Sequence, residues 1–222
     1  MQTETLSLNT ASGESTAFVA RPDQPSPGRA VLVIQEYWGV NDHIKDICQR
    51  YADEGFVAIA PDLYRGRIAA TADEASQFMQ ELRVEDGIDT IKTAIDVTRE
   101  KYEIPHFGIT GYCMGGTYAF RAACLLEGIS AAAAFYGDFP EEEVLKTLTV
   151  PTIFISATKD KWINPEKVAQ LEDIVERYEL PVQSVKYEAD HAFFNDTRPA
   201  VYDEAAARDS WALVIGLFND KL

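Results

Sequence analysis

Strand-length apolar runs alternate with longer helical segments beyond Gly28, and this alternation limits the possible folds more than any other feature. The runs are continuous, as expected of strands covered on both faces. The predicted strands are Ala30–Gln35, Phe56–Ala60, His106–Thr110, Ser130–Tyr136, Thr152–Ser156 and Val182–Tyr187. The predicted helices are Asn41–Glu54, Glu85–Lys101, Asn164–Tyr178 and approximately Ala200–Asp220. The pattern predicts an α/β fold with a mostly parallel sheet and helices on both faces.

The chain has 222 residues, near the upper end of what one hydrophobic core usually organises. It contains no repeat, low-complexity stretch or interdomain linker. The segment Arg21–Gly28, rich in Pro, Gly and Ser, separates a predicted N-terminal hairpin from the rest and comes too early to divide two domains. We therefore expect one domain over residues 1–222.

Composition argues against several classes of function. The net charge of −16, from 36 acidic and 20 basic residues, disfavours binding to nucleic acids or anionic membranes. No apolar run approaches the roughly 18 residues of a membrane helix. The N-terminal sequence lacks the basic start and apolar core of a signal peptide. We expect a cytoplasmic protein, and a monomer because no long apolar stripe is present.

The cysteine count and spacing do not indicate a disulfide framework or a zinc site. There are three, an odd number, with no CxxC pair and no Cys/His spacing typical of zinc sites. Cys48 shares helical spacing with Ile44, Ile47 and Tyr51, and Cys124 follows Phe120 by one helical turn. Both are predicted to be core residues.

Cys113 lies in a different setting. A predicted strand from His106 is followed by Gly-x-Cys-x-Gly-Gly over Gly111–Gly116 and then by the helical run Thr117–Leu126. This order is typical of a nucleophile elbow with cysteine in place of serine. A helix N-terminus lowers the pKa of a thiol, and the backbone N–H of Met114 can stabilise an oxyanion. The alternative is a buried cysteine in a glycine-rich turn.

An acid and a base follow in the order that such an elbow requires. Asp160 comes after the predicted strand Thr152–Ser156, and His191 comes after Val182–Tyr187. The two other histidines, His43 and His106, are interpreted as structural or surface residues. Asp190 is a rival for the acid, but an immediate neighbour seldom faces the histidine ring. The pattern predicts a Cys113–His191–Asp160 triad.

The end of the strand Ala30–Gln35 carries a further candidate. Glu36 follows a buried strand, where desolvation raises a carboxyl pKa unless a partner compensates. It could hydrogen-bond the thiol or a nearby arginine, or form only a structural ion pair. The next backbone N–H, that of Tyr37, is the candidate for a second oxyanion donor.

Several motifs together resemble the dienelactone hydrolases, which include carboxymethylenebutenolidase. They are Gln35–Asn41 (QEYWGVN), Ala60–Tyr64 (APDLY), Gly111–Gly116 (GYCMGG), Tyr136-Gly137 and His191–Phe193 (HAF). The resemblance implies an α/β-hydrolase fold from about residue 30 onward and a Cys-His-Asp triad without metal or cofactor. It also implies that Glu36 pairs with the resting cysteine and helps to form the thiolate when substrate displaces it.

The resemblance implies cleavage of a small ester or lactone, but substrate recognition departs from the family pattern. Asn195 stands about where the family places an arginine that holds the carboxylate of its lactone, with Arg198 nearby in sequence. Arg65 and Arg67 follow another strand. We expect a largely aromatic pocket, and the candidate substrate contacts are Trp38, Arg65, Trp162 and Phe193, with Tyr37 and Phe194 as further aromatic residues.

Two alternatives remain open from the sequence. One is a general carboxylesterase for small esters without preference for lactones. The other is a redox-responsive thiol or ligand-binding protein that has kept the fold. The presence of an acid and a histidine in the required order favours the hydrolase.

Overall fold

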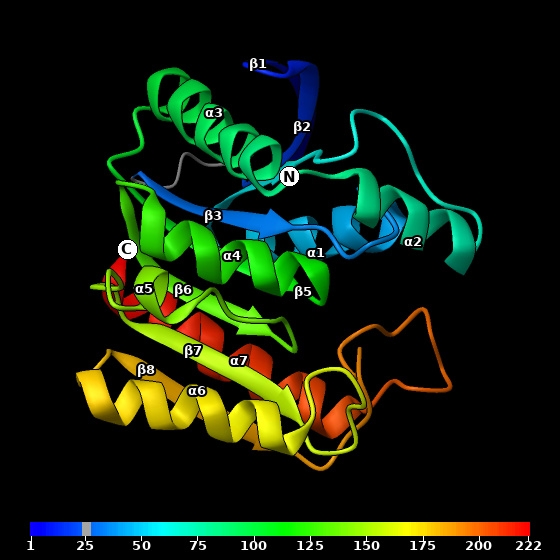
Figure 1. Cartoon of the computed structure of the whole chain (residues 1–222). Coiled ribbons are helices and arrows are strands. Elements are labelled where there is room, and N and C mark those ends of the chain that lie inside the picture. The colour runs from blue at the N-terminus through cyan, green and yellow to red at the C-terminus, as the bar shows by residue number, and fades with distance from the viewer. Residues whose placement is uncertain (24–27) are drawn as a thin grey trace.

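The computed structural model describes residues 1–23 and 28–222, which form one eight-stranded sheet with helices on both faces (Figure 1). The strand order is β1-β2-β4-β3-β5-β6-β7-β8. Each pairing from β4 across to β8 is parallel, whereas β1–β2 and β2–β4 are antiparallel. The strands are β1 Gln2–Thr10, β2 Gly13–Arg21, β3 Arg29–Ile34, β4 Val57–Pro61, β5 His106–Tyr112, β6 Ile129–Phe135, β7 Thr152–Ala157 and β8 Val182–Tyr187.

The helices cover the sheet in two layers. They are α1 Asp42–Asp53, α2 Ala72–Glu81, α3 Val84–Tyr102, α4 Met114–Leu125, α5 Glu142–Leu145, α6 Pro165–Tyr178 and α7 Glu204–Lys221. Helices α3, α4 and α6 cover one face, and α1 and α7 cover the other (Figure 1). Within the described ranges, no helix combines the length and apolar character that crossing a bilayer requires.

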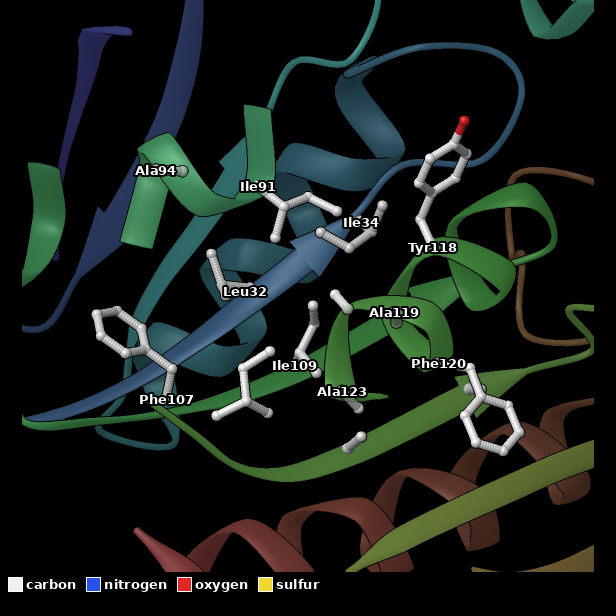
Figure 2. Close-up of a cluster of buried hydrophobic side chains, with 14 of the residues drawn as sticks. Leu32, Ile34, Ile91, Ala94, Phe107, Ile109, Tyr118, Ala119, Phe120 and Ala123 are labelled. Atoms are coloured by element: carbon white, nitrogen blue, oxygen red, sulfur yellow. The ribbon is translucent and has the colours of Figure 1, made fainter. Parts of the chain in front are cut away.

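Alternate residues of the central strands enter two separate cores. Leu32 and Ile34 of β3 pack with Ile91 of α3 and Ala119 of α4 on one side, as Figure 2 shows. Their neighbours Val31 and Val33 point to the other side, among α1 and α7. This two-sided burial explains why the strands are continuous apolar runs.

The structure confirms the predicted parallel sheet and N-terminal hairpin and corrects some boundaries. Strand β8 has the predicted bounds, whereas β5 continues beyond Thr110 to Tyr112, next to Cys113. Helix α7 begins at Glu204 rather than near Ala200 because Asp203 is its N-cap and accepts a hydrogen bond from Ala206 N at 3.0 Å. Residues 24–27 of the predicted Arg21–Gly28 connection lie outside the described residues.

Two helices were not predicted from the sequence. Helix α2 buries only Ala75 completely, so its sequence lacks a broad apolar stripe. Helix α5 is a single turn of four residues. By contrast, α6 begins as its sequence indicates, with Pro165 in the first turn and Asn164 accepting from Lys167 N at 2.9 Å.

Candidate active site

Cys113 lies at the turn between β5 and α4, at the carboxyl edge of the parallel strands. Its backbone has φ 56° and ψ −119°, a left-handed value of φ that is costly for a residue with a Cβ. The side chain is half-buried. The thiol is therefore presented at the start of a helix by a strained turn, as the sequence motif predicts.

Two glycines allow this turn because backbone passes directly against them. A Cβ at Gly111 would lie 2.1 Å from the carbonyl oxygen of Gly115. A Cβ at Gly115 would lie 2.2 Å from the carbonyl oxygen of Ile34, at the end of β3. Side chains at these positions would push the start of α4 away from the sheet, so the glycines fix the depth at which Cys113 sits.

The structure brings His191 and Asp160 into direct contact. Nδ1 of His191 lies 2.5 Å from Oδ2 of Asp160, and the Asp160 side chain is fully buried. The other oxygen, Oδ1, accepts the backbone N–H groups of Trp162 at 2.8 Å and Ile163 at 3.1 Å. Burial opposes ionisation of Asp160, but these contacts outweigh it and hold the carboxyl pKa below its usual value.

His191 is also influenced by Cys113. Burial lowers the pKa of the imidazole, but Asp160 and the sulfur of Cys113 both favour its protonated form and raise the pKa to about 9. The rings of Tyr136 and Trp162 lie beside the imidazole, with centroids 5.0 and 4.9 Å from it. The tilted and edge-on packing restricts the orientation of the ring.

Glu36 is buried at the end of β3, and its hydrogen bond is with Asn195. Nδ2 of Asn195 donates to Oε2 of Glu36 at 2.7 Å. Burial raises the pKa of Glu36, while Asn195 and the positive charges of Arg198 and His191 oppose that rise. The resemblance implied pairing of Glu36 with Cys113; in the part of the chain that the structure describes, no hydrogen bond joins those two side chains.

The four residues predicted to contact the substrate lie in different surroundings. Trp162 is 73% exposed at the rim beside His191, and the ring of the half-buried Trp38 packs edge-on against Tyr37. Phe193, in contrast, is fully buried in the core beside Tyr136 and Tyr187. Arg65 hydrogen-bonds to Ser12 in the β1–β2 turn, across β4 and β3 from the strand that leads to Cys113.

The two backbone N–H groups predicted to be oxyanion donors have no hydrogen-bond partner among the described residues. Among the hydrogen bonds of residues 1–23 and 28–222, none is donated by the N–H of Tyr37 or of Met114. Met114 is held from its side chain instead, because the Tyr64 hydroxyl lies 3.1 Å from its sulfur.

The other cysteines and histidines are placed away from this constellation. Cys48 is fully buried and Cys124 is half-buried, and burial raises the pKa of both thiols. His43 is buried in α1 and His106 is exposed at the start of β5, as interpreted from the sequence. The described residues contain no His, Cys, Asp and Glu group arranged to bind a metal ion.

Sequence reasoning missed two residues of the site. It noted Asn195 only as a departure from a family pattern, and did not identify Tyr136 as a neighbour of the imidazole. Glu36 and Asn195 are 159 residues apart, so no local spacing links them. Tyr136 has an unusual backbone φ of 37°, which is visible in the structure but has no signal in the sequence.

The chain is similar in sequence to known proteins of one family. A model of the dienelactone hydrolase family matches residues 16–222. Protein usf of Aquifex pyrophilus is 36% identical over 217 residues, covering 92% of this chain and 93% of that protein. A protein of Aquifex aeolicus (strain VF5), provisionally named a carboxymethylenebutenolidase, has the same identity and coverage.

Solved structures agree with these relatives. A protein of Klebsiella pneumoniae subsp. pneumoniae MGH 78578, provisionally named a dienelactone hydrolase, superposes with a TM-score of 0.91 at 27% identity, and 98% of each chain is covered. A dienelactone hydrolase-like promiscuous phosphotriesterase from metagenomic libraries has a TM-score of 0.89 at 20% identity, covering 99% of this chain and 98% of that one, and shares the fold. The α/β-hydrolase fold expected from the sequence is confirmed.

Proposed function

The chain belongs to the dienelactone hydrolase family and is a hydrolase, and we propose that it cleaves a small lactone or carboxylic ester with Cys113 as the nucleophile. One observation carries the proposal: a thiol on a strained strand-to-helix turn next to a histidine that a buried carboxylate orients. This is the arrangement that nucleophilic acyl transfer needs.

In the proposed first half-reaction, the Cys113 thiol gives its proton to Glu36 and the thiolate attacks the carbonyl carbon. The N–H groups of Tyr37 and Met114 donate to the resulting oxyanion. When the C–O bond breaks, protonated His191 gives its proton to the leaving oxygen. An ester releases an alcohol at this point, whereas a lactone opens and its hydroxyl end stays attached through the acyl group.

In the second half-reaction, neutral His191 takes a proton from water, and the hydroxide attacks the thioester. The C–S bond breaks, the carboxylic acid leaves, and the thiolate of Cys113 takes its proton back from Glu36. Asp160 keeps Nδ1 of His191 as the hydrogen-bond donor, so that Nε2 can exchange protons with the thiol and water. Glu36 has the role that the family resemblance suggests, accepting the thiol proton when substrate binds. The scheme needs no metal or cofactor.

The substrate side of the site is aromatic. In this proposal Trp162 and Trp38 contact an apolar substrate group, whereas the burial of Phe193 and the position of Arg65 leave both outside the contact surface. We therefore propose that apolar contact, rather than Arg65, contributes to recognition of the substrate.

The test compares hydrolysis of p-nitrophenyl acetate and of a dienelactone by the wild type and by Cys113→Ala. We expect turnover of at least one compound by the wild type and a loss of at least about 10³-fold in the variant. The ratio of the two wild-type rates separates a lactonase from a general esterase. A wild type inactive on both compounds, with peroxide-sensitive Cys113, would favour the redox-responsive thiol instead.

A further inference from the structure

We propose that Asn195 is a positioning residue that holds the carboxyl group of Glu36 through an uncharged hydrogen bond, so that Glu36 can exchange a proton with the Cys113 thiol. The inference rests on the proposed function, because it assigns a device that serves the same nucleophile. The supporting observation is that the buried side-chain amide of Asn195 forms hydrogen bonds with Glu36 on one side and with Thr197 on the other.

The orientation of the Asn195 amide is determined by its surroundings. Its carbonyl oxygen Oδ1 accepts the backbone N–H of Thr197 at 3.1 Å and the Thr197 hydroxyl at 2.6 Å. A backbone N–H can only donate, so the oxygen must face Thr197. The NH₂ group therefore faces Glu36 and donates to Oε2 at 2.7 Å.

The backbone of Asn195 is held equally firmly. Its N–H donates to the carbonyl of Ala192 at 3.0 Å, and its carbonyl accepts the N–H of Arg198 at 3.1 Å. The next residue, Asp196, forms an ion pair with Arg50 of α1 and lies 3.5 Å from the imidazole of His43. These contacts hold the loop after His191 against α1, and they fix the position of Asn195 opposite Glu36.

The partner of Glu36 carries no charge, and this affects how the carboxyl group can titrate. Both side chains are 2% exposed, and no cation lies within ion-pair distance of Glu36 among the described residues. Arg198 and His191 act on Glu36 only through space. Burial raises the pKa of the Tyr37 and Tyr136 phenols, and Glu36 and Cys113 both add to each rise, so these two phenols lie within reach of both side chains. Burial raises the pKa of Glu36 and the Asn195 hydrogen bond opposes that rise.

These surroundings suit a reversible proton acceptor. In the transfer that the family resemblance suggests, the S–H bond of Cys113 breaks, an O–H bond forms on Glu36, and the thiolate remains at the elbow. A guanidinium paired with Glu36 would hold the carboxylate ionised and weaken it as a base. An amide orients the carboxyl group without fixing its charge.

The first measurement is the titration of Glu36 by ¹³C NMR in protein labelled at glutamate carboxyl carbons, with Glu36→Gln identifying the signal. We expect Asn195→Ala to raise the midpoint by about one pH unit or more, because the ionised form loses its hydrogen bond. We expect Thr197→Val to raise it by less, because the backbone N–H of residue 197 still holds the amide. Residue 197 is exposed, so this variant preserves the fold if Asn195→Ala does not.

The second measurement is alkylation of Cys113 by iodoacetamide without substrate, located by peptide mass mapping. Asn195→Ala should change the rate at neutral pH by at least about threefold, and should have no effect in a Glu36→Gln background. An unchanged Glu36 midpoint, or an equal alkylation effect in both backgrounds, would overturn the proposal. Because no turnover is needed, the result stands apart from whether the esters or lactones tested are substrates.

Discussion

The charge of His191 reflects a competition between burial and two partners. Desolvation disfavours the imidazolium, while the buried carboxylate of Asp160 and the sulfur of Cys113 favour it. The partners prevail and raise the pKa to about 9. At neutral pH the ring is thus protonated, which supplies the proton for a leaving oxygen.

The pKa of His191 should depend on Asp160. With only three histidines in the chain, its ring protons can be followed individually by NMR. We expect a wild-type midpoint near 9. In Asp160→Asn the midpoint should decrease by more than about one unit, because the carboxylate that opposes the effect of burial on the imidazole pKa is lost. His43 and His106 serve as internal controls, and a His191 midpoint that Asp160→Asn leaves unchanged would contradict the interpretation.

The same interaction should make stability depend on pH. Because the folded pKa is raised, His191 stabilises the folded chain fully below the unfolded pKa of about 6.5, and this contribution is lost as the pH rises through about 9. Urea unfolding at several pH values should show a decline between these limits that is smaller in Asp160→Asn. An equal decline in both proteins would place its origin elsewhere.

At the scale of elements, the elbow depends on the close approach of α4 to the sheet. The methyl group of Gly115→Ala would meet the backbone oxygen of Ile34, which no side-chain movement can relieve. We expect a loss of about 3 kcal/mol in the free energy of unfolding, and loss of rapid Cys113 alkylation in any folded fraction.

Gly216→Ala is the matched control for that variant. Gly216 lies within α7, and a Cβ there would have no heavy atom within 4 Å. The substitution should stabilise the protein by about 0.5–1 kcal/mol through helix propensity. Urea unfolding of both variants checks the pair; a Gly115→Ala protein as stable as Gly216→Ala would show that the close approach does not limit the fold.

The elements differ in how far sequence could predict them. The central strands and the elbow are predictable because two-sided burial and a tight strand-to-helix turn demand particular residues at short spacing. Helix α2 is not, because an exposed helix needs little apolar periodicity. The contact of Glu36 with Asn195 also escapes prediction, since it depends on the packing of distant loops rather than on local preference.

At the scale of the whole molecule, the site is assembled from loops that the parallel sheet brings to one edge. Glu36 follows β3, Cys113 follows β5, Asp160 follows β7 and His191 follows β8, and the arrowheads of β3 and β7 point to that edge at the right of Figure 1. Parallel strands place their carboxyl ends together, and the two helical layers bury the strands behind them. The order of the sheet therefore converts distant sequence positions into one site.

The role of Cys113 as nucleophile is tested by rapid acid quenching of the wild type with p-nitrophenyl acetate, followed by peptide mass mapping. We expect an acetyl group on Cys113 that appears with the first p-nitrophenol released and disappears as substrate is consumed. Cys48 and Cys124, whose thiol pKa values burial raises, should remain unmodified. Sustained release of p-nitrophenol without acetylation of Cys113, or undiminished turnover by Cys113→Ala, would rule out Cys113 as the nucleophile.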